Sequence, residues 1–407
     1  MEIWRRNLYT IWFSMLLLIM GFSFTFPILP LFFKELGVTD SGKAAFWTGL
    51  SGGAMGAGML IFGPIWGMVG DRYGRKKNAI RAAMGGMLAT GLTGLATDVS
   101  HVLILRFLYG AGTGMMATSS ALVAATTPKE KVGYAMGVLV SAPFIGTTLG
   151  PLAGGILVDT VGFRAAFFVG AGVQAVAGLM YLLLVKEKFE PPPEAQRSVG
   201  NYLGNLFGLA ASRAMFSALM LIFMVQLAPT LILPVLPLFI SELQANTGAT
   251  ISGAVFSLMG LAGAVSSYLT GRISARVGPR TILFACATMA GLLYIPMAAA
   301  TSVYQVMVLI PLAGLFKGPI QATTSAIIAR SAPPDRLGSA FGLMQSANSL
   351  AGGIGPVMGG SIADAISLRA VFLVNGLGFL VVAALTTVLV KAEGKAPAPQ
   401  PEAVPRS

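Results

Sequence analysis

Two basic residues fall inside long apolar stretches, where a charge is costly. Lys317 lies in the middle of "LIPLAGLFKGPIQATTSA", and Arg106 lies in "VLILRFLYGAGTG". An ionisable side chain within a membrane span is expensive and commonly serves a substrate, an ion or a proton. The Arg106 side chain could instead extend to the membrane surface, because Arg106 lies about five residues, or roughly 8 Å, from the start of its stretch. Lys317 is too deep for that, which makes it a candidate for binding or proton coupling.

The composition is that of a polytopic membrane protein. Hydrophobic residues make up 55% of the 407 and charged residues only 10%, whereas a soluble domain carries about 25% charged residues. Twelve mostly apolar stretches reach the roughly 20 residues that a span needs, and we place them near 8–33, 44–69, 78–97, 101–125, 132–158, 165–185, 214–240, 248–274, 280–299, 303–328, 338–365 and 370–391. We therefore predict an all-α membrane protein with 12 transmembrane helices.

The basic residues predict which side of the membrane each loop occupies. If the N-terminus is cytoplasmic, few of the 27 lysines and arginines fall in outer loops, namely Lys34, Lys43, Arg164 and Arg369. Cytoplasmic loops retain such residues, so both termini are predicted inside. The net charge of +12 then reflects topology and predicts no nucleic-acid partner.

Other chemistry is poorly supported. Cys286 is the single cysteine, which excludes an internal disulfide and a cysteine-ligated metal site. "GLSGG" at 49–53 matches a serine-hydrolase pattern, but the one histidine, His101, falls at an outer loop. We predict no enzyme activity, no cofactor and no metal.

A long segment is repeated in the two halves of the chain. "GPLAGGILVDTVGFRAAFF" begins at Gly150 and "GPVMGGSIADAISLRAVFL" at Gly355. The domains predicted are a six-helix bundle at 1–185, a cytoplasmic central loop at 186–213, a second six-helix bundle at 214–391 and a disordered tail at 392–407. Six spans per unit give parallel repeats, a transporter plan with the substrate site between the halves.

Two motifs carry a resemblance to a known family. "GMVGDRYGRKK" at 67–77 resembles the loop signature of the major facilitator superfamily, and the span count and repeats fit as well. The resemblance implies a conformational latch that joins the halves on the cytoplasmic side and favours the outward-open state, formed by Gly67, Asp71, Arg72, Gly74, Arg75 and Lys76. The second-half counterpart from Gly271 has Ala275 in place of the aspartate.

"GTTLGPLAGG" at 146–155 resembles the motif of the superfamily's 12-helix drug/proton antiporters, which marks exporters. Its positions are Gly146, Gly150, Pro151, Gly154 and Gly155. Proline removes a backbone donor and bends a helix, while glycines let a neighbouring helix approach closely. We expect this segment to pack where the two halves meet.

The resemblance places the binding cavity among spans one, four, seven and ten. The candidates there are Phe22, Phe26, Arg106, Met115, Gln226, Phe316, Lys317 and Gln321. Aromatic and methionine side chains suit varied apolar ligands. A cavity with two cations and no carboxylate should prefer neutral or anionic amphiphiles. No acidic residue falls clearly in mid-span, so the candidates for proton coupling are Glu35, Glu242 and Lys317.

The predicted function is secondary active efflux of amphiphilic small molecules by alternating access, with proton antiport. The predicted partners are these lipophilic or amphiphilic substrates, protons and the lipid bilayer. The protein is expected to be a multi-pass monomer of the bacterial inner membrane. A dedicated exporter of one metabolite, such as a sugar or siderophore, is the first alternative, and an uptake symporter is the second.

Overall fold

The computed structural model describes residues 2–187, 213–244, 248–273, 277–331 and 337–389. No strand occurs among them. The first half contains α1 (Ile3–Ser23), α2 (Thr25–Glu35), α3 (Ser41–Tyr73), α4 (Arg75–Thr93), α5 (Val99–Gly112), α6 (Met115–Thr126), the short 3-10 helix η1 (Lys129–Lys131), α7 (Val132–Val161) and α8 (Phe163–Leu184). The second half contains α10 (Arg213–Leu231), α11 (Leu236–Leu243), α12 (Ala249–Ile273), α13 (Pro279–Met297), α14 (Val303–Ser331), α15 (Leu337–Ala365) and α16 (Leu368–Leu389).

Nine segments of this described chain are long and apolar enough to cross a membrane. Helix α1 runs into α2 and α10 into α11, so each pair makes one span. The predicted count of 12 needs three more. Helix α4 opens with several basic residues, α15 is diluted by glycine and serine, and the fourth predicted span is divided between α5 and α6. The count and the sidedness of the termini stay predictions. Most of the predicted central loop and the whole predicted tail lie outside the described residues.

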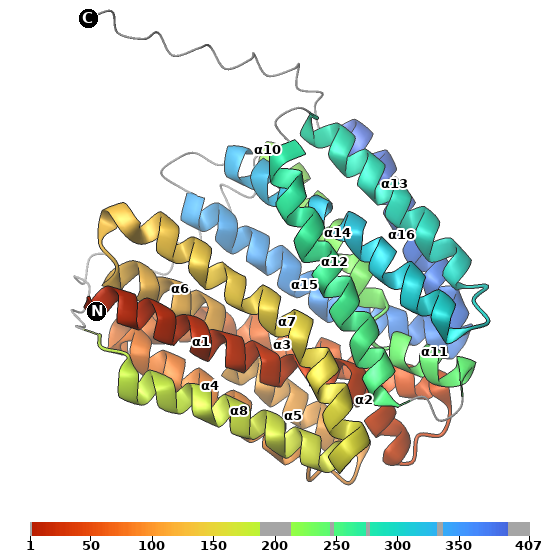
Figure 1. The fold of residues 1–407 in the computed structure, drawn as a ribbon, viewed down its shortest axis with the longest axis horizontal. Coiled ribbons are helices and arrows are strands. Elements are labelled where there is room, and N and C mark those ends of the chain that lie inside the picture. Colours follow the sequence, from red (N-terminus) through yellow and green to blue (C-terminus); the bar gives the residue numbers. More distant parts are fainter. Residues whose placement is uncertain (1, 188–212, 245–247, 274–276, 332–336, 390–407) are drawn as a thin grey trace, which may run out of the picture.

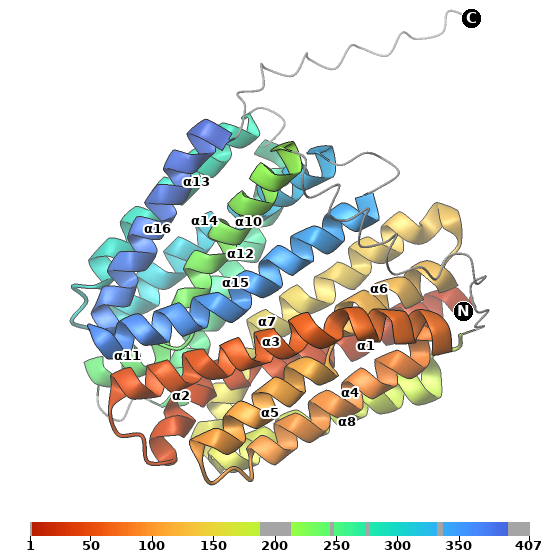
Figure 2. The ribbon, with the colours of Figure 1, turned by 180° about the vertical axis from the view of Figure 1, so that it is seen from behind.

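Helices of each half pack on one another. In the first half α1 packs on α7 and α8, α4 on α8, and α3 on α5; in the second half α12 packs on α14, α13 on α16, and α10 on α15. Two seams join the halves, α3 with α15 and α7 with α12. Figures 1 and 2 show the halves meeting near α2 and α11 and diverging toward the end that holds the N-terminus. That end is the predicted cytoplasmic end.

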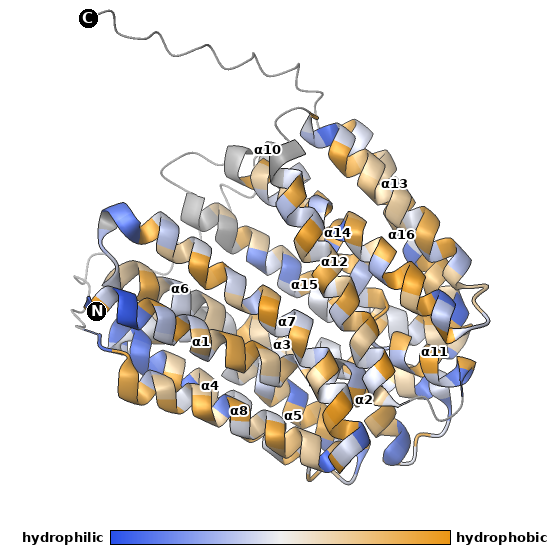
Figure 3. Ribbon diagram, in the orientation of Figure 1, coloured by the Kyte–Doolittle hydropathy of each residue, from blue (hydrophilic) through white to orange (hydrophobic). Residues whose placement is uncertain are grey.

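The surface has the polarity of a membrane protein. Figure 3 shows hydrophilic ribbon mostly at the two ends of the helices and hydrophobic ribbon along their sides. Large apolar side chains such as Leu183, Phe216 and Leu261 are more than half exposed on helix flanks. Apolar surface of this kind is unfavourable in water, whereas contact with lipid tails carries no such cost.

Candidate functional site

The Gly-Pro segment of α7 packs on two helices at once. A Cβ at Gly154 would lie 2.7 Å from the Phe24 Cα at the α1–α2 junction, within its own half. A Cβ at Gly155 would lie 2.7 Å from the carbonyl carbon of Ala249 in α12, in the other half. Real Cβ atoms do not approach backbone so closely. Small residues are therefore required on α7 wherever the helices touch.

The Gly-Pro segment of α15 repeats this arrangement. A Cβ at Gly359 would lie 2.8 Å from the carbonyl carbon of Leu231 at the end of α10. A Cβ at Gly360 would lie 2.8 Å from the Phe46 Cα in α3, across the interface. Pro356 faces Gly49 of α3 just as Pro151 faces Gly253 of α12. Both seams thus use one geometry, with one glycine facing inward and the next facing the opposite half.

Matching hydroxyl bonds fix each Gly-Pro helix to the first helix of its own half. Ser23 Oγ donates to the Gly146 carbonyl oxygen at 2.8 Å, and Thr230 Oγ1 donates to the Ala351 carbonyl oxygen at 3.2 Å. The donors and the acceptors are repeat counterparts. The duplication is therefore preserved in individual contacts and not only in sequence.

Contacts across the seams fade toward the predicted cytoplasmic end. In α3 the close contacts to α15 run from Gly42 to Gly56, and a Cβ at Gly63 or Gly67 would meet no described atom within 4 Å. Helix α7 behaves in the same way, since Gly133 and Gly137 also face open space. The halves are therefore joined at the predicted outer end and separated at the other.

The predicted cytoplasmic latch forms a tight turn. Gly74 has a φ of 107° and both ends α3 and starts α4. Glu187 accepts from the backbone N–H groups of Arg75 and Lys76 at 3.1 and 2.9 Å, so an acid at the start of the central loop caps α4. The Arg72 guanidinium lies 5.4 Å from the Tyr73 ring centroid. The Asp71 side chain lies outside the described part, and the latch itself stays a prediction.

Arg106 is placed inside the first bundle and not on an open surface. It is 7% exposed and lines a cavity of about 10 Å³ between α2, α4, α5 and α8. That volume is close to one water molecule. Arg106 Nε and the buried Gln174 Oε1 have no partner among the described residues, while Gln174 Nε2 donates to Thr90 Oγ1 at 3.0 Å. Arg106 therefore sits in a polar pocket within the helix bundle.

Two aromatic candidates form a contact beside this pocket. Phe22 of α1 stacks on Tyr109 of α5, with ring centroids 5.1 Å apart. Met115 is 9% exposed in the core of the first half, and Phe316 packs against a core cluster to which both halves contribute. The side chain of Phe26 lies outside the described part. Of the predicted apolar lining residues, Met115 thus has the setting of a core residue.

Lys317 lies on the inward face of α14. The exposed residues Tyr304, Val308, Leu312 and Leu315 form one stripe of this helix, while the buried Ile310, Ala313 and Thr324 form the opposite one. Helical spacing places Lys317 and Gln321 in line with the buried stripe. Both side chains are only partly buried. Lys317 has no hydrogen bond or ion pair within the described part of the chain, so its ammonium group is available to a ligand.

Among the described residues, no hydrogen bond or ion pair joins the remaining polar candidates to Lys317. Gln226 in α10 is partly buried. Glu35 lies at the predicted outer end, 3.9 Å from Arg164, whose guanidinium also donates to the carbonyl oxygens of Gly94 and Ala96. Glu242 is exposed at the end of α11. The structure therefore brings no two of the three proton-coupling candidates together in an ion pair.

A network that sequence reasoning missed supports the break in the fourth span. Gly114 has a φ of 122°, and the break leaves carbonyl groups without helical partners. Arg81 of α4 donates to the carbonyl oxygen of Gly112 at 2.8 Å, and Trp66 Nε1 donates to that of Ala111. The Arg81 guanidinium also lies 3.4 Å from the Trp66 ring centroid. In the sequence Arg81 looks like one more basic residue near a cytoplasmic loop.

Arg81→Met is expected to lower the free energy of unfolding by about 2–4 kcal/mol, because it leaves partly buried carbonyl groups unsatisfied. Thermal denaturation in detergent measures this. Arg280→Met is the matched control, since Arg280 also donates to a carbonyl oxygen, that of Thr387, but at an exposed site. Equal losses for the two variants would contradict the assignment.

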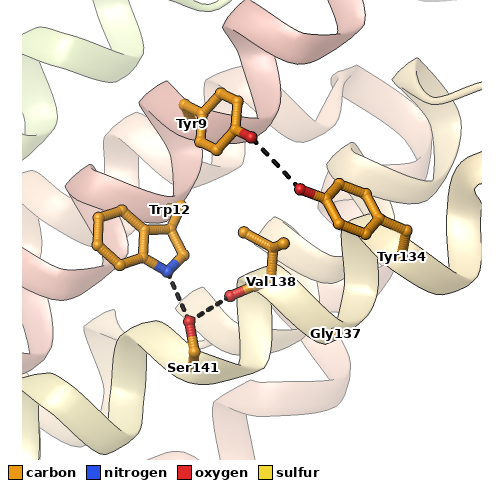
Figure 4. Close-up of a pocket in the computed structure, with 6 residues that line it drawn as sticks. All are labelled: Tyr9, Trp12, Tyr134, Gly137, Val138 and Ser141. Atoms are coloured by element: carbon orange, nitrogen blue, oxygen red, sulfur yellow. Dashed lines mark hydrogen bonds between the residues drawn. The ribbon is translucent and has the colours of Figure 1, made fainter.

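A groove lies between α1 and α7, in the parts of these helices nearer the predicted cytoplasmic end. Figure 4 shows the residues that line it. It has a volume of about 490 Å³ and is lined by Tyr9, Trp12, Tyr134, Gly137, Val138 and Ser141. Trp12 Nε1 donates to Ser141 Oγ at 2.8 Å, and the two tyrosine hydroxyls lie 3.4 Å apart. Tyrosine and tryptophan commonly occupy the membrane–water boundary, where one end is apolar and the other wet.

Solved transporter structures share this fold. A bacterial homologue of the human lysosomal transporter Spinster, in an inward-facing and occupied conformation, superposes with a TM-score of 0.79 at 14% identity, covering 96% of this chain and 97% of the other. The human organic anion transporter MFSD10 superposes with a TM-score of 0.68 at 17% identity, covering 95% of this chain and all of the other. At these identities the likeness concerns the fold alone.

Curated relatives are closer in sequence. "Multidrug resistance protein MdtG" of Escherichia fergusonii is 34% identical over 374 residues, 91% of each chain. The protein of the same name from Enterobacter lignolyticus is 32% identical over 393 residues, 96% of this chain and 94% of the relative. The model of the Major Facilitator Superfamily matches residues 11–300 and 236–406. The predicted family and the all-α fold are confirmed, and the chain belongs to the major facilitator superfamily.

Proposed function

We propose that the protein exports amphiphilic small molecules, including drugs, across the bacterial inner membrane by alternating access. The observation that carries this proposal is the pair of Gly-Pro seams, α7 with α12 and α3 with α15. They close one end of the interface between the halves while the other end stays apart. A substrate site between two repeats that open in turn is the plan of a secondary transporter. The names of the bacterial relatives support drugs as the substrates.

The charge of the candidate site supports a substrate class. Lys317 is partly buried on the inward face of α14 and has no polar partner among the described residues. The acidic residues of the described helices lie near helix ends. An unbalanced cation within a span favours neutral or anionic ligands, since a lipophilic cation would meet repulsion in a low-dielectric site. Gln226 and Gln321 would supply hydrogen bonds, and Phe22 and Phe316 apolar contact.

Proton antiport is the proposed energy source. Glu35 and Glu242 at the predicted outer end and Lys317 within a span are the candidate carriers. Replacing Glu35 by Gln would also remove its contact with Arg164, so Glu242→Gln gives the cleaner single test. If a variant loses export driven by a pH gradient but retains export down a substrate concentration gradient, the replaced residue is the proton carrier.

Resistance profiling tests the proposed function. A bacterium lacking its main drug pumps would express the protein, and the lowest inhibitory concentrations of a drug panel would be measured. We expect protection of at least about fourfold against several neutral or anionic amphiphiles. Protection against none, with export of one sugar or siderophore, would favour a dedicated exporter. Greater drug accumulation in the expressing cells would favour an uptake symporter.

A further inference from the structure

Asp159 makes a direct polar contact between the two halves. It lies in the last turn of α7, and its carboxylate accepts from the backbone N–H groups of Ala249 and Thr250, each at 2.9 Å. Both groups belong to the first turn of α12, in the other half. The first N–H groups of a helix lack partners within it, and a carboxylate there gains charge-assisted bonds and a favourable helix dipole.

The fit around this carboxylate is close. A Cβ on Gly248 would collide with Asp159 Oδ2. Glycine just before α12 thus allows the carboxylate to reach both N–H groups. No ion pair to Asp159 exists within the described part of the chain. The nearest basic residue after it on its own segment, Arg164, donates to Gly94 and Ala96 instead. The contact is therefore made with backbone alone.

The repeat counterpart, Asp364, makes no such contact in the part of the chain that the structure describes. Asp364 lies near the end of α15, and the helix across the seam is α3. The N-terminus of α3 is instead capped by the residue just before it, because Asp40 Oδ1 accepts from the Lys43 N–H at 2.8 Å. No hydrogen bond joins Asp364 to α3 in the described residues. The seams are alike in their glycines and different in this contact.

The length of the two capped helices explains the difference. Gly360 packs on Ala45 in one seam and Gly155 packs on Ala249 in the other, so these two alanines are equivalent. Ala249 is the first residue of α12, whereas α3 begins one turn before Ala45, at Ser41. The unpaired N–H groups of α12 therefore lie opposite Asp159. The first N–H groups of α3 lie one turn before Ala45, so they are not opposite Asp364.

From this asymmetry we infer that Asp159 is the residue that holds the outer end closed, as a one-sided latch between α7 and α12. The inference rests on the proposed alternating-access cycle. For the outer end to open, α12 must leave α7, and both hydrogen bonds must break. Asp159 is thus a positioning residue that sets the balance between the two open states. Weakening its bonds shifts the protein toward the outward-open state.

Distance measurement between spin labels tests the latch formed by Asp159 at the outer end. Leu95 at the outer end of α4 and Tyr304 at the outer end of α14 are 58% and 77% exposed and belong to opposite halves. Each becomes a labelled cysteine in a Cys286→Ala background. Asp159→Asn keeps the size but loses the charge that strengthens both bonds. We expect the ratio of long to short label separations to rise about fivefold.

Asp364→Asn is the matched control and should leave the distances unchanged. Gly248→Ala provides a second route, because its added methyl group displaces the carboxylate and should shift the distances in the same direction. The inference is overturned if Asp159→Asn and Gly248→Ala, both eluting as monodisperse protein, keep the parent distances. It is also overturned if Asp364→Asn has the same effect. These distances do not depend on what is exported, so failure here differs from failure of the proposed function.

Discussion

Gly155→Val is expected to lower drug export at least tenfold without loss of the folded protein. A Cβ at this position would lie 2.7 Å from the carbonyl carbon of Ala249 and 2.8 Å from the Thr250 Cα. Both are backbone atoms of a helix in the other half and cannot rotate away. Overpacking of this kind costs about 1–3 kcal/mol, and the cost falls on the state in which the outer end is closed. Destabilising that state by this amount shifts the protein toward the outward-open state and stalls the transport cycle.

Gly133→Val is the control for this experiment. Gly133 lies on the same helix but faces open space, with no described atom within 4 Å of a Cβ. Export rates of both variants, normalised to the amount of protein in the membrane, are measured with a fluorescent substrate in intact cells. Undiminished export by Gly155→Val would show that close contact of α7 and α12 is not needed for transport.

Lys317→Met is expected to have opposite effects on stability and on function. An unpaired charge within a span is costly, by about 2.5–3.5 kcal/mol on insertion scales, so its removal should raise the thermal stability in detergent. Export of anionic amphiphiles should fall about tenfold, because the cation that attracts them is lost. Export of neutral ones should change less.

Lys131→Met controls for the loss of a positive charge, since Lys131 is exposed beyond the end of a span. It should alter neither stability nor selectivity. If Lys317→Met exported an anionic and a cationic amphiphile in the parent ratio, Lys317 would not be a specificity-determining residue. A lower stability of Lys317→Met would instead indicate that the ammonium group has a structural role.

The repeat was the most informative feature of the sequence. Because "GPLAGG" and "GPVMGG" recur in one register, the sequence predicts two similar halves and a contact at these glycines. The structure places Gly155 and Gly360 across the interface, and Gly154 and Gly359 within their own halves. Spacing alone cannot tell which glycine faces which way. That depends on how each helix is rotated by packing against α1 or α10.

Other parts of the site could not be predicted because they depend on where helices begin and break. The bonds of Asp159 exist because α12 starts at Ala249, one turn later than the repeat would suggest. The role of Arg81 depends on the break at Gly114, which turns ordinary carbonyl groups into acceptors. Arg106 was expected in the binding cavity, but the structure encloses it among α2, α4, α5 and α8. The composition of this span does not indicate in which direction the Arg106 side chain points.

Transport by the purified protein tests directly whether it exports amphiphiles in exchange for protons. The protein would be reconstituted into liposomes, and an outwardly or inwardly directed pH gradient would be imposed by a pH jump. The internal concentration of an anionic fluorescent amphiphile is the measurement, with protein-free liposomes as the inactive control. We expect gradient-driven accumulation that exceeds this control at least tenfold and collapses when the gradient and the membrane potential are dissipated. Accumulation equal to that of protein-free liposomes would contradict export by this protein, and accumulation that persists without a gradient would contradict proton antiport.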